Sequence, residues 1–235
     1  MKRFAALILT WILLLTFAGC GNSGNALSGS TEESKISEKA NNNTSASTDS
    51  DGNNSAENTE GGSKMLVAYF SLAGEQYGVG VIEEGNTSII AHMIAEQTGA
   101  DLFEIEAVNP YPASHSELLD VSRQEMADNA RPDIAGTVEN MDDYDTIFIG
   151  YPNWWGDMPM IVYNFLESYD LSGKTIVPFC THGGSGLSGT ESTIEDITGG
   201  TMVDGFAIAG TTAQNDRDTA RSEVTKWLRE GGFVE

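Results

Sequence analysis

Three short segments rich in glycine and in polar side chains each follow an apolar run of the sequence. The first contains Ser71–Gly74 and, after an excursion over 75–84, Gly85-Asn86-Thr87 at a predicted helix start. Hydroxyls, an amide and free backbone N–H groups at a helix N-terminus are typical of an anion site. Capping of the helix by Asn86 and Thr87 explains the same residues without a ligand. This segment alone therefore indicates either a phosphate site or an ordinary helix cap.

A phosphate at this segment would be held without a cationic side chain. No Lys or Arg lies between Lys64 and Arg123, and no Lys follows Gly85, so the segment is not a Walker A loop. It is not a Rossmann fingerprint either, because Glu83 stands where the third glycine of a pattern begun by Gly78-Val79-Gly80 would lie.

The second segment carries two consecutive tryptophans, Trp154 and Trp155, followed by Gly156. Two adjacent side chains in one loop cannot both point into a core, but at the end of a strand they suit packing against a flat aromatic ligand. Gly156 lets the backbone approach such a ligand closely. The alternative is a tryptophan pair in a core or at an interface.

The third segment, Thr181–Gly186, has three glycines in its last four positions. Such a loop offers backbone N–H and C=O groups to the edge of a heterocycle. His182 with Ser185 or Ser188 suggests a hydrolase, but the G-x-S-x-G nucleophile elbow is missing.

Metal and thiol chemistry find little support in the sequence. His92, His115 and His182 have no spacing useful for a metal site, so no metal is expected. Cys180 ends an apolar run and is expected to be a buried apolar side chain rather than a reactive thiol.

The elements that must position these segments are strands alternating with helices. Strands are expected over 65–70, 102–108, 146–149, 175–180 and 202–209. Helices are expected over 86–99, 114–130, 159–166, 188–197 and 220–228. This alternation predicts a doubly wound α/β domain with a mostly parallel sheet covered on both faces. Such sheets bind ligands beyond the carboxyl ends of their strands, where the three segments lie.

Composition bounds the function further. The 235 residues include 12 Lys or Arg and 35 Asp or Glu, a net charge of −23. This charge excludes nucleic acid as an expected partner, because nucleic-acid binding relies on basic patches. Two cysteines cannot build a disulfide framework.

The first residues have the pattern of a secretion signal. Lys2 and Arg3 precede an apolar run over 4–17 that is too short for a permanent transmembrane helix. Phe17-Ala18-Gly19-Cys20 resembles a bacterial lipobox, which predicts a lipoprotein signal peptide over 1–19 and a diacylglycerol on Cys20. A bacterial extracytoplasmic location, membrane-anchored only through this lipid, is expected; the alternative is a secreted protein with a plain signal peptide.

The rest of the chain divides into a tether and a domain. Residues 20–63 are rich in Ser, Asn and Gly and carry no aromatic side chain, so a disordered tether is expected. Residues 64–235 carry 8 basic and 28 acidic side chains, a net charge of −20, and have the length of one domain.

The three segments in this order resemble the flavodoxin-like family of bacteria. The likeness rests on Tyr69-Phe70-Ser71, on Gly85-Asn86-Thr87, and on the patterns Y-P-x-W-W-G-D-M-P at 151–159 and F-C-T-H-x-G-S-G at 179–186. It implies a five-stranded parallel sheet of order 2-1-3-4-5 and bound FMN. The phosphate would lie at the first segment and the isoalloxazine ring between the other two. Two features depart from the family pattern, the excursion over 75–84 and the polar Asn153.

The resemblance implies a set of FMN-binding residues in the three segments and assigns no catalytic residue. These are Ser71, Ala73, Gly85, Asn86, Thr87, Pro152, Asn153, Trp154, Trp155, Gly156, Thr181, His182, Gly183, Gly184, Ser185 and Gly186.

Three functions follow as hypotheses. The first is an electron carrier whose acidic face docks a basic redox partner. The second is an FMN-dependent oxidoreductase that takes electrons from NAD(P)H to a quinone or a similar small acceptor. The third is a surface scaffold without redox activity. The charge of −20 would lower the reduction potential of a bound flavin, because it disfavours a further negative charge.

Overall fold

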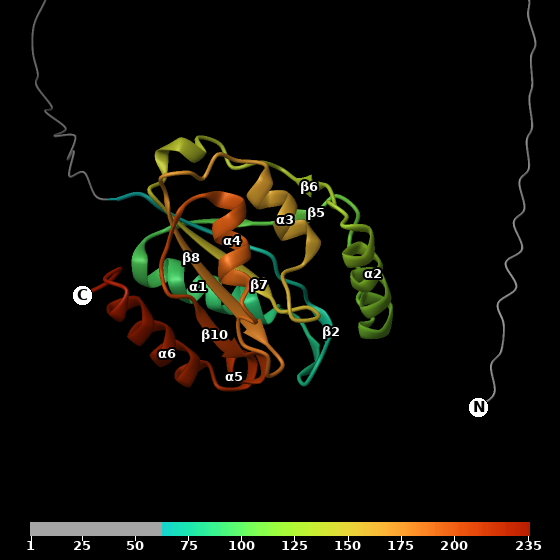
Figure 1. The fold of residues 1–235 in the computed structure, drawn as a ribbon. Helices are drawn as coiled ribbons and strands as arrows, with labels where there is room; N and C mark the ends of the chain where they lie inside the picture. The colour runs from blue at the N-terminus through green and yellow to red at the C-terminus, as the bar shows by residue number, and fades with distance from the viewer. Residues whose placement is uncertain (1–62) are drawn as a thin grey trace, which may run out of the picture. The chain divides into compact units, whose positions relative to one another are not determined.

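The computed structural model describes residues 63–235. Its sheet strands and the helices that connect them alternate along the chain as expected (Figure 1). The strands are β1 Met65–Tyr69, β2 Gly74–Gln76, β3 Gly80–Ile82, β4 Asp101–Glu104, β5 Glu106–Ala107, β6 Ile134–Ala135, β7 Thr146–Pro152, β8 Thr175–His182, β9 Thr201–Met202 and β10 Phe206–Ala209. The helices are α1 Asn86–Thr98, α2 His115–Asp128, the 3₁₀ turn Met141–Asp143, α3 Met160–Glu167, α4 Thr190–Thr198, α5 Gly210–Asn215 and α6 Arg217–Glu230.

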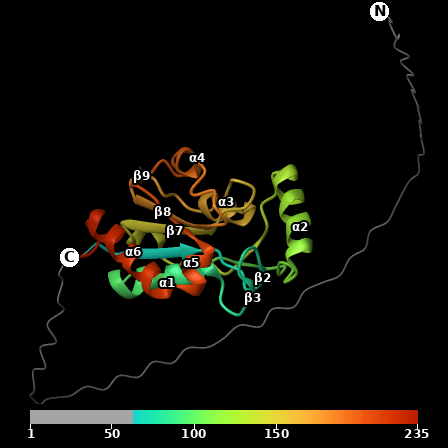
Figure 2. The same ribbon diagram turned by 90° about the horizontal axis from the view of Figure 1, so that it is seen from below.

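The main sheet has the order β10-β8-β7-β1-β4, and all of its pairs are parallel. In chain order of these five strands this is 2-1-3-4-5, so the predicted topology is confirmed. Helices α1, α5 and α6 cover one face and α3 and α4 the other, as Figure 2 shows. Each face buries its own apolar cluster, with Phe148 and Ile94 in one and Phe165 and Tyr151 in the other. Because both faces are buried, the central strands β1, β7 and β8 are mostly apolar runs in the sequence, whereas the edge strand β4 is largely exposed.

The predicted fifth strand over 202–209 is interrupted. Its first part, β9, pairs with the start of β8, and its second part, β10, pairs with the end of β8. The Ile176 carbonyl accepts the Val203 N–H, so the backbone of Ile176 faces the segment that contains β9 and β10. Pro178 lies two residues further along β8 and therefore faces the same segment. Proline has no N–H to donate, and the ladder therefore breaks between β9 and β10.

The second predicted strand, over 102–108, is shorter in the structure than predicted. It starts one residue earlier, as β4, and pairs with β1 until β1 ends at Tyr69. Beyond the buried Ile105 the chain has no partner in the sheet, and β5 pairs antiparallel with β6 instead.

The excursion over 75–84 forms a small antiparallel hairpin of β2 and β3, which the sequence analysis did not predict. Gly74, Gly78 and Gly80 all have positive φ angles, which glycine adopts without strain. The hairpin lies beside α2 beyond the carboxyl end of β1 (Figures 1 and 2).

Candidate functional site

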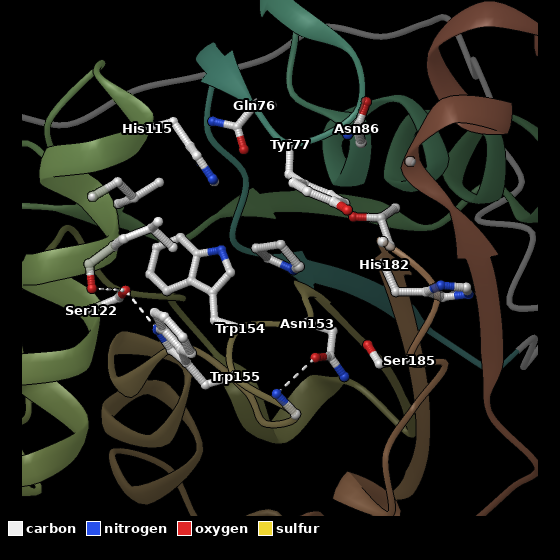
Figure 3. Close-up of a pocket in the computed structure, with 17 residues that line it drawn as sticks. Gln76, Tyr77, Asn86, His115, Ser122, Asn153, Trp154, Trp155, His182 and Ser185 are labelled. Carbon is white, nitrogen blue, oxygen red and sulfur yellow. Dashed lines mark hydrogen bonds between the residues drawn. The ribbon is translucent and has the colours of Figure 1, made fainter.

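A cavity of about 310 Å³ lies at the carboxyl ends of β7 and β8, where the fold class places ligands. Its walls come from the hairpin, α1, α2, the segment after β7, the segment after β8 and the start of α5 (Figure 3). The lining residues are Gln76, Tyr77, Asn86, His115, Leu118, Leu119, Ser122, Pro152, Asn153, Trp154, Trp155, Gly156, Thr181, His182, Gly183, Ser185 and Gly210.

Most of the residues expected to bind FMN lie in this lining, and they come from all three sequence segments. Those in the lining are Asn86, Pro152, Asn153, Trp154, Trp155, Gly156, Thr181, His182, Gly183 and Ser185. Those outside it are Ser71, Ala73, Gly85, Thr87, Gly184 and Gly186. Pro152, Thr181 and His182 are the last residues of strands rather than loop residues.

The start of α1 is built by residues of the first segment. The N-cap residue of α1 is Gly85, and no side chain of the cap bonds to the helix. Asn86 and Thr87 are the first two residues of the helix, so the alternative that they cap it is wrong. The Ser71 hydroxyl after β1 accepts the Ser88 N–H at 3.0 Å and serves as the cap instead. The backbone N–H groups of Asn86 and Thr87 have no partner within the helix, and Asn86 lies in the lining of the cavity.

Thr87 turns into the protein rather than toward the cavity. Its hydroxyl is 2.8 Å from the Thr181 hydroxyl, and both side chains are buried. This pair ties the first turn of α1 to the end of β8. Thr87 therefore holds the two walls of the cavity together, whereas the neighbouring Asn86 faces the cavity.

Asn153 joins the segments that follow β7 and β8. Its Nδ2 donates to the Gly186 carbonyl and to the Ser188 hydroxyl, each at 2.9 Å, and its Oδ1 accepts the Gly156 N–H at 3.0 Å. The Asn153 N–H also donates to the Thr181 carbonyl at 2.8 Å. A polar residue is needed here because an apolar one could make none of the side-chain bonds.

The two tryptophans have different surroundings. Trp154 packs edge-on against Phe70 and Tyr111, with ring centroids 5.4 and 5.6 Å apart. Trp155 has a φ of 58° and remains 47% exposed. Its Nε1 donates to the Ser122 hydroxyl on α2 at 3.0 Å, and the Arg123 guanidinium stacks on its ring. Both residues line the cavity, and the exposure of Trp155 confirms the prediction that the two side chains do not both point into the core.

The end of β8 and the segment after it carry neither a hydrolase dyad nor a reactive thiol. His182 Nδ1 accepts the Gly184 N–H at 2.9 Å, which requires a neutral nitrogen, and burial lowers the pKa of His182. The Ser188 hydroxyl donates to the Ser185 carbonyl, not to His182. Cys180 is fully buried, and burial raises its pKa to about 12, so the expectation of a buried apolar thiol is confirmed.

The other wall of the cavity comes from residues outside the three segments. Tyr77 at the hairpin tip lies over Gly183, where an added Cβ would come within 2.9 Å of the Tyr77 ring. His115 begins α2, and its ring centroid is 6.3 Å from that of Tyr77. Leu118 and Leu119 continue this wall along α2. The one signal in the sequence for this wall is Tyr77, an aromatic residue within an excursion rich in Gly and Glu.

The lining contains no Lys or Arg. The described residues also hold no group of three or more potential metal ligands. Within 63–235, no helix combines the length and hydropathy needed to cross a bilayer.

Two buried polar atoms of the lining have no hydrogen-bond partner, Asn86 Oδ1 and His115 Nδ1. Buried polar atoms are nearly always paired, so each points to a group that the protein itself does not provide. They lie on opposite walls, one on α1 and one on α2.

Comparison with known proteins identifies the family. The sequence matches the family model described as Flavodoxin over residues 64–230. Two solved structures named as flavoproteins, from Bacteroides eggerthii and Bacteroides uniformis, are each 31% identical to this chain, with TM-scores of 0.57 and 0.56. Each alignment covers 72% of this chain, and 98% and 99% of the respective relatives.

A third structure, a flavoprotein of Lactobacillus acidophilus in complex with FMN, is 22% identical and has a TM-score of 0.50. The alignment covers 71% of this chain and 99% of the Lactobacillus chain, and it supports the fold. No curated protein matches this sequence. With the match over 64–230, the sheet order and the cavity at its switch point in agreement, this chain belongs to the flavodoxin family.

Proposed function

We propose that residues 64–235 bind FMN in this cavity and transfer electrons outside the cytoplasm. The observation that carries the proposal is the cavity itself, which brings the start of α1 together with the segments after β7 and β8. The family match supports the same cofactor, and so does the FMN named in the Lactobacillus structure. When bound, FMN supplies redox chemistry by accepting and releasing one or two electrons.

The residues present fit the phosphate and sugar parts of FMN. The N–H groups of Asn86 and Thr87 in the first turn of α1 would bind the phosphate, with the helix dipole favouring negative charge. Ser71 and Thr87 would contribute mainly by fixing this turn, because their hydroxyls already bond to Ser88 and Thr181. The unpartnered Asn86 Oδ1 would accept a ribityl hydroxyl. Gly210 leaves the room that Asn86 needs, since a Cβ there would lie 2.6 Å from Asn86 Nδ2.

The segments after β7 and β8 would hold the isoalloxazine ring. Trp154 and Trp155 offer flat aromatic surfaces, and Gly183 and Ser185 expose backbone groups to a ring edge. Asn153 fixes the distance between the two segments. The net charge of −20 would lower the reduction potential of the bound flavin and favour a basic protein partner, both less so at high salt.

The expected result is one FMN bound per chain. The full chain, stripped of flavin and titrated with FMN, should quench FMN fluorescence to a 1:1 end point, and dithionite should bleach the bound flavin reversibly. A folded chain that binds no FMN would support the scaffold hypothesis and sink this proposal.

The location outside the cytoplasm is part of the proposal and rests on residues 1–63. The signal peptide, Cys20 and all of the tether except Ser63 fall outside the described residues. In a bacterial host that processes lipoproteins, the full chain should fractionate with membranes. Labelled fatty acid should be incorporated into the native chain and not into the variant Cys20→Ser, which cannot carry the diacylglycerol. A native chain that takes up no labelled fatty acid would contradict lipidation.

A second function, an FMN-dependent oxidoreductase for a small acceptor, is favoured by one observation. The hairpin and α2 give the cavity a wall outside the three segments, lined by Tyr77, His115 and Leu118. Such a wall suits a small molecule held beside the flavin.

A further inference from the structure

The backbone after β8 is held in place by the side chain of His182, the last residue of that strand. His182 Nδ1 accepts the N–H of Gly184, two residues further on, at 2.9 Å. Gly184 has a φ of 132°, a backbone conformation that glycine adopts without strain and other residues rarely adopt. The bond therefore fixes the peptide group between Gly183 and Gly184.

This bond acts on the part of the segment that faces the cavity. Gly183 and Ser185 line the cavity, and Gly184, which joins them, does not. In Figure 3 the His182 ring points away from the two tryptophans. His182 is therefore placed to set the backbone of Gly183 and Ser185 rather than to stack on a ring between the segments after β7 and β8.

The bond between His182 and Gly184 exists only while the imidazole is neutral. A neutral imidazole has one acceptor nitrogen, whereas both nitrogens of the protonated ring are donors. A proton on Nδ1 would therefore face the Gly184 N–H, donor against donor, and the peptide group would have to turn away. Two consecutive glycines, Gly183 and Gly184, allow such a turn at little steric cost.

No charged side chain of the cavity lining opposes or assists that proton. The lining contains no Asp, Glu, Lys or Arg, and its titratable side chains besides His182 are Tyr77 and His115. The neighbouring elements β10, α5 and α1 place uncharged residues beside His182 or in the same lining, namely Ala209, Gly210 and Asn86. Burial alone lowers the pKa of His182, which keeps the ring neutral at pH 7 and lets it take up a proton only in acid.

From these contacts we propose that His182 is a positioning residue that switches the segment after β8 with pH. Neutral His182 holds Gly184 and gives the segment the form that binds FMN, whereas protonated His182 releases Gly184 and weakens the binding. The proposal rests on the proposed FMN binding and adds its regulation by pH. The loss of one hydrogen bond corresponds to about fivefold weaker binding. Since linkage is reciprocal, FMN binding should also lower the pKa of His182 further.

The first measurement follows the bond in the flavin-free full chain. In an NMR titration, the Gly184 amide signal should shift together with the His182 ring signals as the pH falls, because both report the same bond. The same titration with bound FMN should give a lower pKa for His182. An equal pKa with and without FMN would contradict the proposal.

The second measurement is the Kd for FMN at about pH 7.5 and at one pH unit below the measured pKa of His182. The variant for comparison is His182→Asn, because an asparagine side chain accepts the N–H two residues further on at any pH. Its Kd at about pH 7.5 should lie within about threefold of the native value. The ratio of the native Kd to the His182→Asn Kd should rise about fourfold at the lower pH. The FMN phosphate also takes up a proton near about pH 6, but this affects both chains alike.

Two further variants separate this role from a structural one. His182→Leu cannot accept the bond and should bind FMN about fivefold more weakly than His182→Asn at both pH values. His92→Gln, on α1 outside this cavity, should keep the pH dependence of the native chain. Loss of the pH dependence in His92→Gln would place the titrating group on α1 and overturn the assignment to His182.

The outcomes distinguish the two proposals. A chain that binds no FMN at either pH overturns the proposed function. A chain that binds FMN, but with the same ratio of the two Kd values at both pH values, overturns the switch and leaves FMN binding intact. A ratio that rises about fourfold in acid, with His182→Leu weak at both pH values, supports the switch.

Discussion

Gly85→Ala is expected to lower the free energy of unfolding by about 2 kcal/mol and to weaken FMN binding at least tenfold. The added Cβ would lie 2.6 Å from the Leu72 carbonyl oxygen and would collide with the Ser71 hydroxyl. Backbone cannot yield cheaply, and overpacking of this kind costs about 1–3 kcal/mol. Movement of Ser71 also removes the bond to the Ser88 N–H that caps α1. Urea unfolding of the flavin-free chain and FMN fluorescence titration measure the two effects.

Gly99→Ala is the matched control at the other end of α1. Gly99 has a φ of 72°, so alanine there is strained by about 1 kcal/mol, but its Cβ would meet no other atom within contact distance. Its FMN affinity should equal that of the native chain. If Gly85→Ala also bound FMN as tightly as the native chain, the start of α1 would not be the phosphate site.

Asn153→Leu is expected to weaken FMN binding about tenfold and to cost about 2 kcal/mol of stability. The substitution removes the bonds to the Gly186 carbonyl, the Ser188 hydroxyl and the Gly156 N–H. Each such bond contributes about 1 kcal/mol net, and an N–H left without a partner adds to the loss. The segments after β7 and β8 would no longer be held at a fixed separation, so a flat ring between them would bind less tightly. Calorimetric titration with FMN measures the affinity.

Asn164→Leu is the corresponding control for Asn153→Leu. Asn164 Nδ2 also donates to a backbone carbonyl, that of Pro132 at 2.8 Å, but it lies outside the cavity. A loss of about 1 kcal/mol of stability with unchanged FMN affinity is expected. Equal FMN affinities for both variants would show that Asn153 only supports the fold.

The positions of the sheet strands and of most of the helices could be predicted from the sequence because their signals are local, whereas the strand order was implied by the family resemblance. A strand buried on both faces is a run of apolar residues whatever its place in the sheet. The residues that follow Thr146 in β7 and Thr175 in β8 form such runs. The break between β9 and β10 could not be found this way, because its cause is Pro178 in the neighbouring strand. The hairpin could not be predicted for a similar reason, since contacts with α2 hold it and its own strands have only three residues each.

The residues of the candidate site likewise include some with a local signal in the sequence and some without one. Asn86, Trp154 and Gly183 could be predicted because each follows a strand that ends at one edge of the sheet. His115 could not, because only the path of the chain between β5 and α2 brings it over that edge. The bonds of Asn153 likewise join residues that become neighbours only in the folded protein.

The way in which the hairpin is attached to the domain separates selection on its tip from selection on the cofactor-binding start of α1. It leaves the chain at Gly74 and returns at Gly85, between the two parts of the segment that builds the start of α1. Substitutions at its tip change what stands opposite Trp154 without moving β1 or α1. In the course of evolution this short insertion could therefore be replaced, and a new reaction partner acquired, while the residues that bind the cofactor stayed the same.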